Sequence, residues 1–198
     1  MKLLKTISKF YLLIVVALTF ASSYVSAEPD PELMRSSVVV VAYPEFASLA
    51  LKSFSWAGNH ANISEGLQKT DFSVKALIDE AIKQAIKQKS YAFTDNNKGN
   101  LLIQYHVSLA SELNDTALTL KYGLSPGLRA NSVKAKEHER GTLVVDIIEP
   151  ESAKVVWRGA VEVFTGVEDS QSGRQKRVNS LLIDLFSGIP GQKSANSK

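Results

Sequence analysis

The chain of 198 residues is 44% hydrophobic and 22% charged, a composition that predicts one globular domain and excludes an intrinsically disordered protein. Because it contains no cysteine, disulfides, thiolate metal sites, a cysteine nucleophile and lipidation on an N-terminal cysteine are excluded. Setting aside the three lysines of residues 1–27 leaves 20 basic and 20 acidic side chains, without the excess of positive charge that binding to a nucleic acid needs.

The first 27 residues have the layout of a secretory signal peptide. Residues 1–9 are basic, residues 10–21 form an apolar run (FYLLIVVALTFA), and Val25 and Ala27 supply the small residues of a cleavage site. A transmembrane helix needs about 18 apolar residues or more, so this run is short for a permanent anchor. We therefore predict cleavage after Ala27 and a periplasmic mature protein, with an uncleaved signal anchor as the alternative.

The mature chain begins with residues 28–36, whose two prolines and three acids predict an extended lead-in. Residues 37–43 (SVVVVAY) are a β-branched run typical of a buried strand. Residues 52–57 (KSFSWA) alternate between polar and apolar side chains, which predicts a second strand. Residues 71–89 form the clearest helix, because apolar side chains recur every three or four residues. Asp71 is placed to cap its N-terminus.

The second half of the chain contains three more predicted strands. They cover residues 101–110, 141–148 and 154–164, and the last two are close enough in sequence to form a hairpin. Simple alternation places Val156 and Arg158 on the same face of that hairpin.

A final helix is predicted over residues 174–186, stopped by Gly188 and Pro190 and followed by a disordered tail at 191–198. Its first turn (RQKR, residues 174–177) is basic, although the helix dipole disfavours cations there. Either an acidic partner or a solubilising surface explains this cluster.

This order of elements predicts a single α+β domain over residues 37–190. Hairpin strands favour a mostly antiparallel sheet, and the two amphipathic helices are expected to pack on one of its faces.

Residues 111–140 are the longest stretch without a clear assignment. Residues 116–122 (TALTLKY) are compatible with a further strand, and the rest forms a long connection. Connections of more than about 12–15 residues are often functional or mobile, so we expect a binding surface here. The residues singled out for it are Tyr122, Ser125, Arg129, His138 and Arg158.

The motifs that resemble catalytic or metal sites are weak. Residues 123–127 (GLSPG) match the G-x-S-x-G pattern of a hydrolase nucleophile, but Pro126 has no N–H to donate to an oxyanion, which favours a turn. His60, His106 and His138 lack the spacing of metal ligands. No catalytic residue, metal site or cofactor is therefore predicted.

Short motifs in several strands resemble a family of bacterial envelope proteins known as domain of unknown function 4136. The motifs are residues 141–146 (GTLVVD), residues 156–159 (VWRG), residues 52–56 (KSFSW) and the ending at 188–190 (GIP). The resemblance covers most of residues 37–190. It implies an exported protein. The family has no established catalytic residues that could be assigned to positions of this chain. Members are often lipoproteins, so membrane association is implied too, but this chain lacks the acceptor cysteine.

The absence of a catalytic constellation favours a non-enzymatic interaction or assembly-accessory domain whose partner is an envelope protein. A carrier that holds a small apolar or lipid ligand between the sheet and the helices is the alternative. A hydrolase using Ser125 or His138 is a third, weaker hypothesis.

Overall fold

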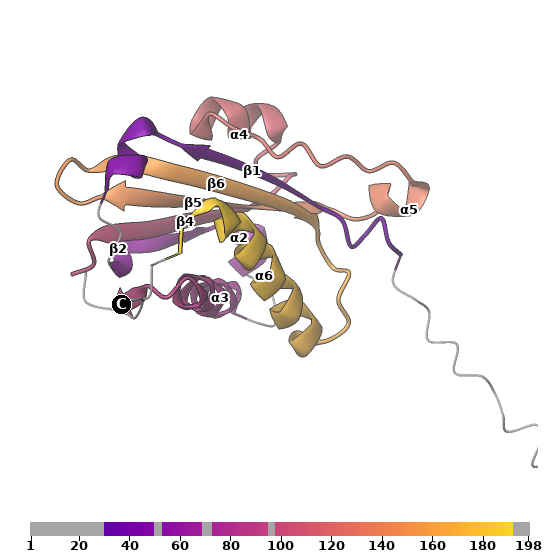
Figure 1. Ribbon diagram of the computed structural model, residues 1–198. Coiled ribbons are helices and arrows are strands. Elements are labelled where there is room, and N and C mark those ends of the chain that lie inside the picture. The colour runs from indigo at the N-terminus through magenta and orange to yellow at the C-terminus, as the bar shows by residue number, and fades with distance from the viewer. Residues whose placement is uncertain (1–29, 50–52, 69–72, 95–97, 192–198) are drawn as a thin grey trace, which may run out of the picture.

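The centre of the fold is a six-stranded sheet with the strand order β1-β6-β5-β4-β2-β3 (Figure 1). The computed structural model describes residues 30–49, 53–68, 73–94 and 98–191. The strands are β1 (Ser36–Ala42), β2 (Ser53–Ile63), β3 (Ala92–Thr94), β4 (Leu101–Leu109), β5 (Arg140–Glu149) and β6 (Lys154–Phe164). The helices are η1 (Pro44–Ser48), α2 (Glu65–Gln68), α3 (Val74–Gln88), α4 (Asp115–Tyr122), α5 (Val133–Lys136), α6 (Gln171–Leu185) and η2 (Phe186–Gly188).

Most strand pairings are antiparallel, which confirms the predicted α+β class. Strand β6 pairs antiparallel with β1 and with β5, and β5 pairs antiparallel with β4. Strand β2 runs parallel to β3 and β4, because α3 carries the chain across the sheet between them. The predicted hairpin is formed by β5 and β6, and β6 has the predicted bounds.

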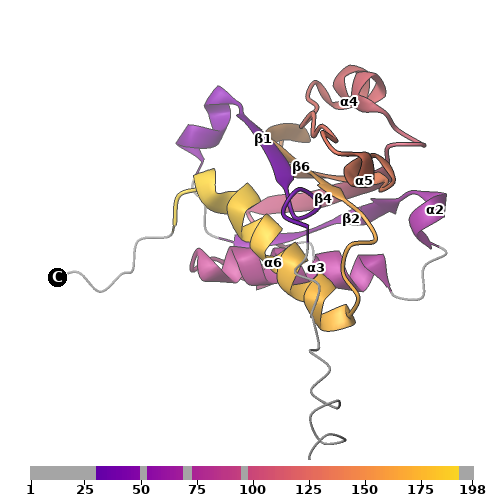
Figure 2. The same ribbon diagram turned by 90° about the vertical axis from the view of Figure 1, so that its right-hand side faces the viewer.

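Helices α3 and α6 cover one face of the sheet, as predicted (Figures 1 and 2). The buried stripe of α3 consists of Val74, Ile78, Ala81, Ile82, Ala85 and Ile86. Its N-cap is Ser73, whose Oγ accepts a hydrogen bond from the Ala76 N–H at 3.1 Å. The predicted cap, Asp71, lies outside the described residues. Helix α6 begins three residues earlier than predicted, because Ser170 caps it in the same way.

Aromatic packing holds the C-terminal end of α6 against the sheet. Trp157 of β6 stacks on Phe186, with ring centroids 5.4 Å apart and both side chains fully buried. Gly159 leaves the space that the indole needs: a Cβ there would lie 2.5 Å from Trp157 Cη2 and 2.7 Å from Leu185 Cδ1.

A β-bulge corrects the predicted facing of the hairpin residues. Ile147 pairs with Trp157 and Ile148 with Val155, so Val156 is the extra residue in β6. Val156 consequently joins the buried core under the helices, whereas Arg158 contacts Tyr122 and Asp146 on the opposite face. Simple alternation is wrong here because the bulge breaks the two-residue period.

The opposite face of the sheet is covered by α4, α5 and the chain between them (Figure 1). The strand suggested for residues 116–122 is wrong, since this segment is helical in α4. The Asn114 side chain caps the first turn, and Gly123 ends the helix with a φ of 75°. Leu118 is fully buried, but Leu120, which a strand would place on the same face, is 84% exposed.

The lead-in is compact where the structure describes it. Residues 31–34 form a turn rather than an extended segment, because the Leu33 N–H donates to the Asp30 carbonyl at 3.0 Å. Leu33 is buried and packs with Phe164 and Leu128. The predicted signal peptide and all but the first residue of the predicted tail lie outside the described residues.

We predict that Gly159→Ala destabilises the protein by roughly 1–3 kcal/mol, because the added methyl group overpacks the rigid indole. Gly58→Ala is the matched control, since a Cβ at Gly58 would meet nothing within 4 Å. Urea unfolding followed by circular dichroism measures both changes. Equal effects of the two variants would contradict the role given to Gly159.

Candidate functional site

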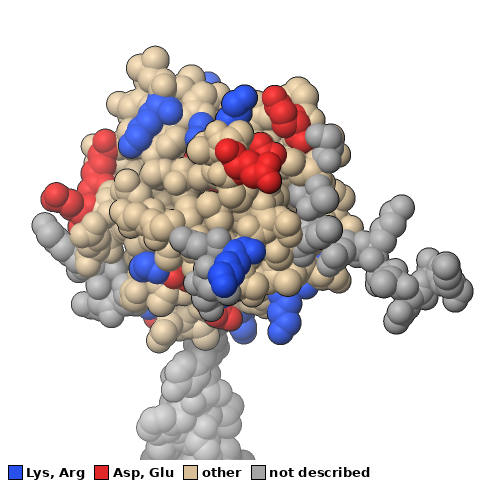
Figure 3. All heavy atoms as spheres, turned by 90° about the vertical axis from the view of Figure 1, so that its left-hand side faces the viewer, with Lys and Arg blue, Asp and Glu red and all other residues tan. Residues whose placement is uncertain are grey.

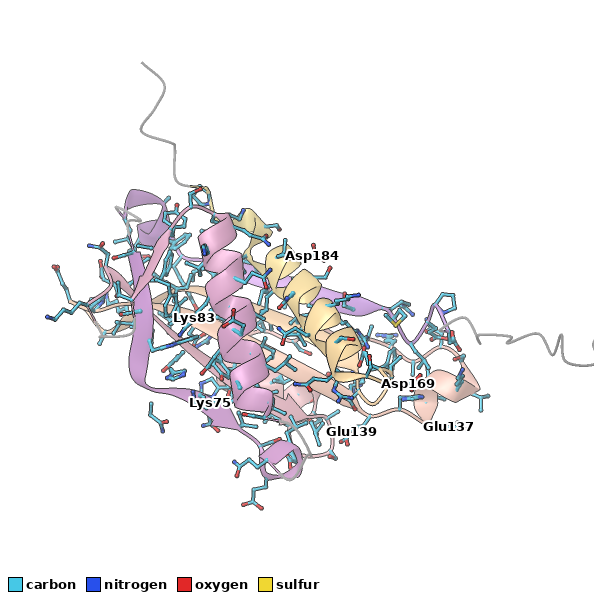
Figure 4. All side chains as sticks on the ribbon, turned by 90° about the horizontal axis from the view of Figure 1, so that it is seen from below. Lys75, Lys83, Glu137, Glu139, Asp169 and Asp184 are labelled. Atoms are coloured by element: carbon cyan, nitrogen blue, oxygen red, sulfur yellow. The ribbon has the colours of Figure 1, made fainter. Side chains whose placement is uncertain are left out.

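An apolar cavity of about 170 Å³ lies between α3, α6 and the sheet. Figure 4 shows why it forms: the two helices lie close together at their C-terminal ends and diverge toward their N-terminal ends. Its apolar walls include Val74, Leu77 and Ile78 of α3, Val178, Leu181 and Leu182 of α6, and Val107, Leu143, Val161 and Val163 of the sheet. Branched aliphatic side chains on strands and helices thus surround a space that they do not fill.

Charged side chains stand at the mouth of this cavity. Arg174 and Arg177 are one turn apart on α6, so they lie on the same face of the helix, and Glu168 precedes the helix. Arg177 forms an ion pair with Glu168 and also donates to the Leu33 carbonyl at 3.0 Å and to the Phe164 carbonyl at 3.3 Å. Arg174 donates to the Glu168 backbone carbonyl at 3.3 Å. The guanidinium groups are therefore fixed beside an otherwise apolar space.

The Arg177 guanidinium is largely buried. Its side chain is 9% exposed, and its Nε has no hydrogen-bond partner among the described residues. A buried N–H that lacks an acceptor is costly, and such groups are rare in folded proteins.

A second hollow of about 160 Å³ adjoins the cavity. It is lined by Ser73, Ala76, Leu77, Gln171, Arg174 and Gln175. Leu77 and Arg174 line both spaces, so these two side chains separate an apolar interior from a polar vestibule.

Two of the predicted surface residues, Tyr122 and Arg158, meet on the opposite face of the sheet. Arg158 Nη1 donates to the Tyr122 carbonyl at 2.8 Å, and its guanidinium carbon lies 5.4 Å from the centre of the Tyr122 ring. Arg158 also forms a bidentate ion pair with the buried Asp146, at 2.5 and 2.7 Å. Tyr122 is 7% exposed, so these contacts fasten α4 to the sheet.

The other three predicted surface residues are dispersed. Ser125 follows α4 in a segment without helix or strand, which agrees with a turn, and its Oγ is buried without a hydrogen-bond partner among the described residues. Arg129 is exposed. His138 lies near the open end of the β5–β6 hairpin, where its Nδ1 is 3.0 Å from the Thr165 carbonyl oxygen. The structure therefore does not gather the five residues at one site.

A buried ion pair holds the chain that follows α4. Arg140 Nη1 lies 3.0 Å from Glu162 Oε1 and donates to the Leu128 carbonyl at 2.8 Å, while the Leu128 N–H donates to Glu162 Oε2 at 2.7 Å. Burial raises the pKa of the Glu162 carboxyl above its ordinary value, although the contacts with Leu128 and Arg140 act in the opposite direction.

A polar network that the sequence analysis missed joins β2, α3 and β4. His60 Nε2 lies 3.2 Å from Asp79 Oδ1, which accepts a hydrogen bond from the Tyr105 hydroxyl at 2.7 Å. Burial tends to raise the pKa of the Asp79 carboxyl, but hydrogen bonds from Lys75 and Tyr105 lower it below its ordinary value. No motif in the sequence relates these residues, and none of them lines the cavity or the vestibule.

Within the ranges that the structure covers, no group of three or more His, Cys, Asp or Glu side chains could hold a metal ion. None of the helices in those ranges has the length and apolar character to cross a membrane. On the face shown in Figure 3, acidic and basic side chains are dispersed without a broad patch of one sign.

Comparison with known proteins identifies a family but no close relative. The family model "Domain of unknown function (DUF4136)" matches residues 39–191. No curated protein matches the chain.

Among solved structures, the PelC dodecamer from Paraburkholderia phytofirmans covers 80% of this chain and 100% of its own, with 10% identity and a TM-score of 0.48. A variant of that dodecamer in another crystal form covers 77% and 95%, with 11% identity and a TM-score of 0.47. A PDZ domain protein from Parabacteroides distasonis covers 80% of this chain and 36% of its own, with 16% identity and a TM-score of 0.44. These likenesses are too distant to carry an argument about function.

The raised pKa of Glu162 predicts a pH-dependent stability. The folded state binds the proton more tightly than the unfolded state, so this residue's contribution to stability falls as the pH rises above the ordinary value of 4.5. The Glu162→Gln variant lacks the titrating carboxyl and therefore lacks this pH-dependent contribution. We expect the free energy of unfolding of the variant, relative to wild type, to rise with pH by at most about 1.4 kcal/mol per pH unit.

Urea unfolding at several pH values between 4 and 8 tests this prediction. Glu151→Gln, at an exposed position in the hairpin turn, is the control and should follow the wild type. If Glu162→Gln also follows the wild type at every pH, the effect of burial on Glu162 is refuted.

Proposed function

The chain belongs to the domain of unknown function 4136 family, which specifies no activity, and we propose from its site that it is an exported, non-catalytic domain that binds a small apolar ligand. The binding site is the cavity between α3, α6 and the sheet. The observation that carries this proposal is a half-open apolar hollow of about 170 Å³ between the two helices and the sheet.

The apolar lining of the cavity supports a ligand. The space is open on one side, and several of its aliphatic side chains, such as Leu77 and Val178, are only half-buried. A ligand that fills the space removes this apolar surface from water. Sites for small apolar molecules are typically such preformed, mostly apolar hollows.

The chemistry of the walls supports a non-catalytic role. Among the described residues that line the cavity, none is a histidine, cysteine or serine, and the one carboxylate, Glu168, is paired with Arg177. Nucleophilic or general-base chemistry normally needs such a group beside an activating partner. The predicted signal peptide of residues 1–27 supports export to the periplasm.

We predict that the mature protein binds the fluorescent apolar probe N-phenyl-1-naphthylamine with micromolar affinity. Val178→Phe fills part of the cavity and should weaken binding at least tenfold without lowering the unfolding temperature. Val133→Phe is the matched control, because Val133 is 75% exposed on α5. Probe titration of delipidated protein measures the three affinities. Absence of binding to wild type, or equal affinities for all three proteins, contradicts the proposal.

An interaction module is the second candidate, and the edge strand β1 favours it. Within the described residues, β1 has a strand partner on one side only. Its sequence carries no charge or proline, and Val38 and Val40 are 40% and 39% exposed. An uncharged, exposed edge of this kind can pair with a strand of another protein.

We expect Val38→Lys to remove a strand-pairing partner, because a charge on an edge strand opposes pairing. Crosslinking of the tagged protein in cells, followed by mass spectrometry, should retain one envelope protein with wild type and with Val133→Lys, but not with Val38→Lys. The interaction hypothesis fails if Val38→Lys retains the same protein as wild type.

A further inference from the structure

We infer that the outer edge of strand β1 pairs with the same edge of a second copy of this chain, in an antiparallel arrangement with a two-fold axis at Val39. The inference rests on the second candidate function, since it names the partner of the same edge strand, and it does not depend on a ligand in the cavity. On this inference, the protein that is retained through Val38 in cells is the chain itself.

The main chain of β1 presents alternate residues to its outer edge. In an antiparallel ladder, every second residue of a strand bonds to one neighbour, and the residues between them direct their N–H and C=O groups to the other side. The Tyr43 N–H donates to the Val156 carbonyl at 3.0 Å, whereas the adjacent Ala42 lies opposite Trp157, so Ala42 is one of the residues between. The residues directed to the outer edge are therefore Ser36, Val38, Val40 and Ala42. Another antiparallel strand would continue this ladder.

A two-fold axis at Val39 pairs the whole of β1 with itself. It places Val38 opposite Val40 of the second copy and Ser36 opposite Ala42 of the second copy, so every outward residue meets an outward residue and can exchange both main-chain hydrogen bonds. An axis at Val38 or at Val40 also aligns outward residues, but it leaves one end of β1 without a counterpart in the other β1. The interface is therefore the same patch on both copies, as in a closed dimer.

The side chains of β1 favour this pairing and do not protect against it. Natural edge strands commonly carry a charge, a proline or a bulge that prevents pairing. The seven residues of β1 include none of these, and their register with β6 is continuous. Val38 and Val40 are 40% and 39% exposed, and the axis at Val39 pairs them as valine opposite valine. A second copy thus brings an uncharged strand of equal length and matching side chains.

The nearest basic residue also agrees with this register. Arg35 directly precedes β1, and its side chain is 46% exposed beside Glu32. Since Arg35 and Tyr43 are equally far from Val39 in sequence, the axis places Arg35 of one copy level with Tyr43 of the other. Tyr43 is 38% exposed, and an aromatic ring attracts a guanidinium. The two arginines are thereby kept apart rather than placed opposite each other.

The described segments on either side of β1 turn toward the body of the domain. Before β1, Leu33 is buried and packs with Phe164 and Leu128. After β1, the helix η1 places Phe46 in the core under α3 and α6. A second strand can therefore approach β1 from outside without displacing these buried side chains.

Single cysteine variants of this cysteine-free chain test the register. The axis places Val39 opposite itself, and directly opposed residues have Cβ atoms about 4.5–5.5 Å apart, close to the distance that a disulfide spans. The two copies of Val38 are diagonal neighbours at about 7–8 Å, which is too far. Under oxidation by copper phenanthroline, Val39→Cys should form a crosslinked dimer about tenfold faster than Val38→Cys.

Exposure favours the opposite order, which makes these two variants a matched pair. Val38 is 40% exposed, whereas Val39 is half-buried and packs against the cluster around Leu118. Random collisions between monomers would therefore crosslink Val38→Cys faster. The inferred pairing is refuted if Val38→Cys crosslinks as fast as Val39→Cys, or if neither variant crosslinks.

Sedimentation equilibrium of the exported protein, purified from cells, measures the association without a cysteine. Wild type should have twice the mass of one chain. Val38→Lys should have the mass of one chain, because its lysine faces Val40 of the second copy. Val133→Lys is the control and should remain a dimer, since Val133 is 75% exposed on α5. A monomeric wild type overturns the inference, and so does a Val38→Lys variant that remains a dimer.

The outcomes separate this inference from the second candidate function. If wild type is a monomer, but crosslinking in cells retains a different protein that Val38→Lys loses, the second copy is refuted while the role of the edge stands. If wild type is a monomer and Val38→Lys retains the same proteins as wild type, both fail.

Discussion

The close packing of Trp157 against Phe186 determines how α6 crosses the sheet. The indole lies flat because Gly159 has no side chain, and this lets the C-terminal end of α6 approach the strands. At the other end of the helix the sheet presents valine and leucine side chains, which are too small to fill the wider gap between α3 and α6. The helix pair α3 and α6 is therefore tightly packed at its C-terminal end and leaves the cavity open at its N-terminal end.

The two faces of the sheet are held by different forces. Under α3 and α6 a large cluster of apolar side chains makes most of the contacts, and the network of His60, Asp79 and Tyr105 lies beside it. On the other face, Arg140 and Arg158 bind both a buried carboxylate of the sheet and backbone carbonyls of the covering chain. Directional contacts of this kind fix the chain between α4 and α5 in place. The segment expected to present a binding surface is therefore largely a cover, in which Tyr122 serves as a contact point.

Most of the secondary structure could be predicted from the sequence, because β-branched runs and the stripe of α3 are strong local signals. The failures have local causes. Helix α4 depends on caps at Asn114 and Gly123, which outweigh the alternation of residues 116–122. The bulge at Val156 depends on how β5 pairs with β6, which no single strand reveals. The cavity could not be predicted, since it arises from the angle between two helices, although the basic cluster at its mouth was visible in the sequence.

The position of β1 in the sheet has a consequence for how the chain folds. Strand β1 is the first strand of the described residues, but it pairs with β6, so that Val38 lies opposite Val161. A chain made from its N-terminus exposes the valines of β1 until the last strand has emerged. Contacts between segments so far apart in sequence form slowly, and unpaired apolar strands aggregate in the meantime. The strand that is synthesised before the rest of the sheet is thus among the last to find its partner.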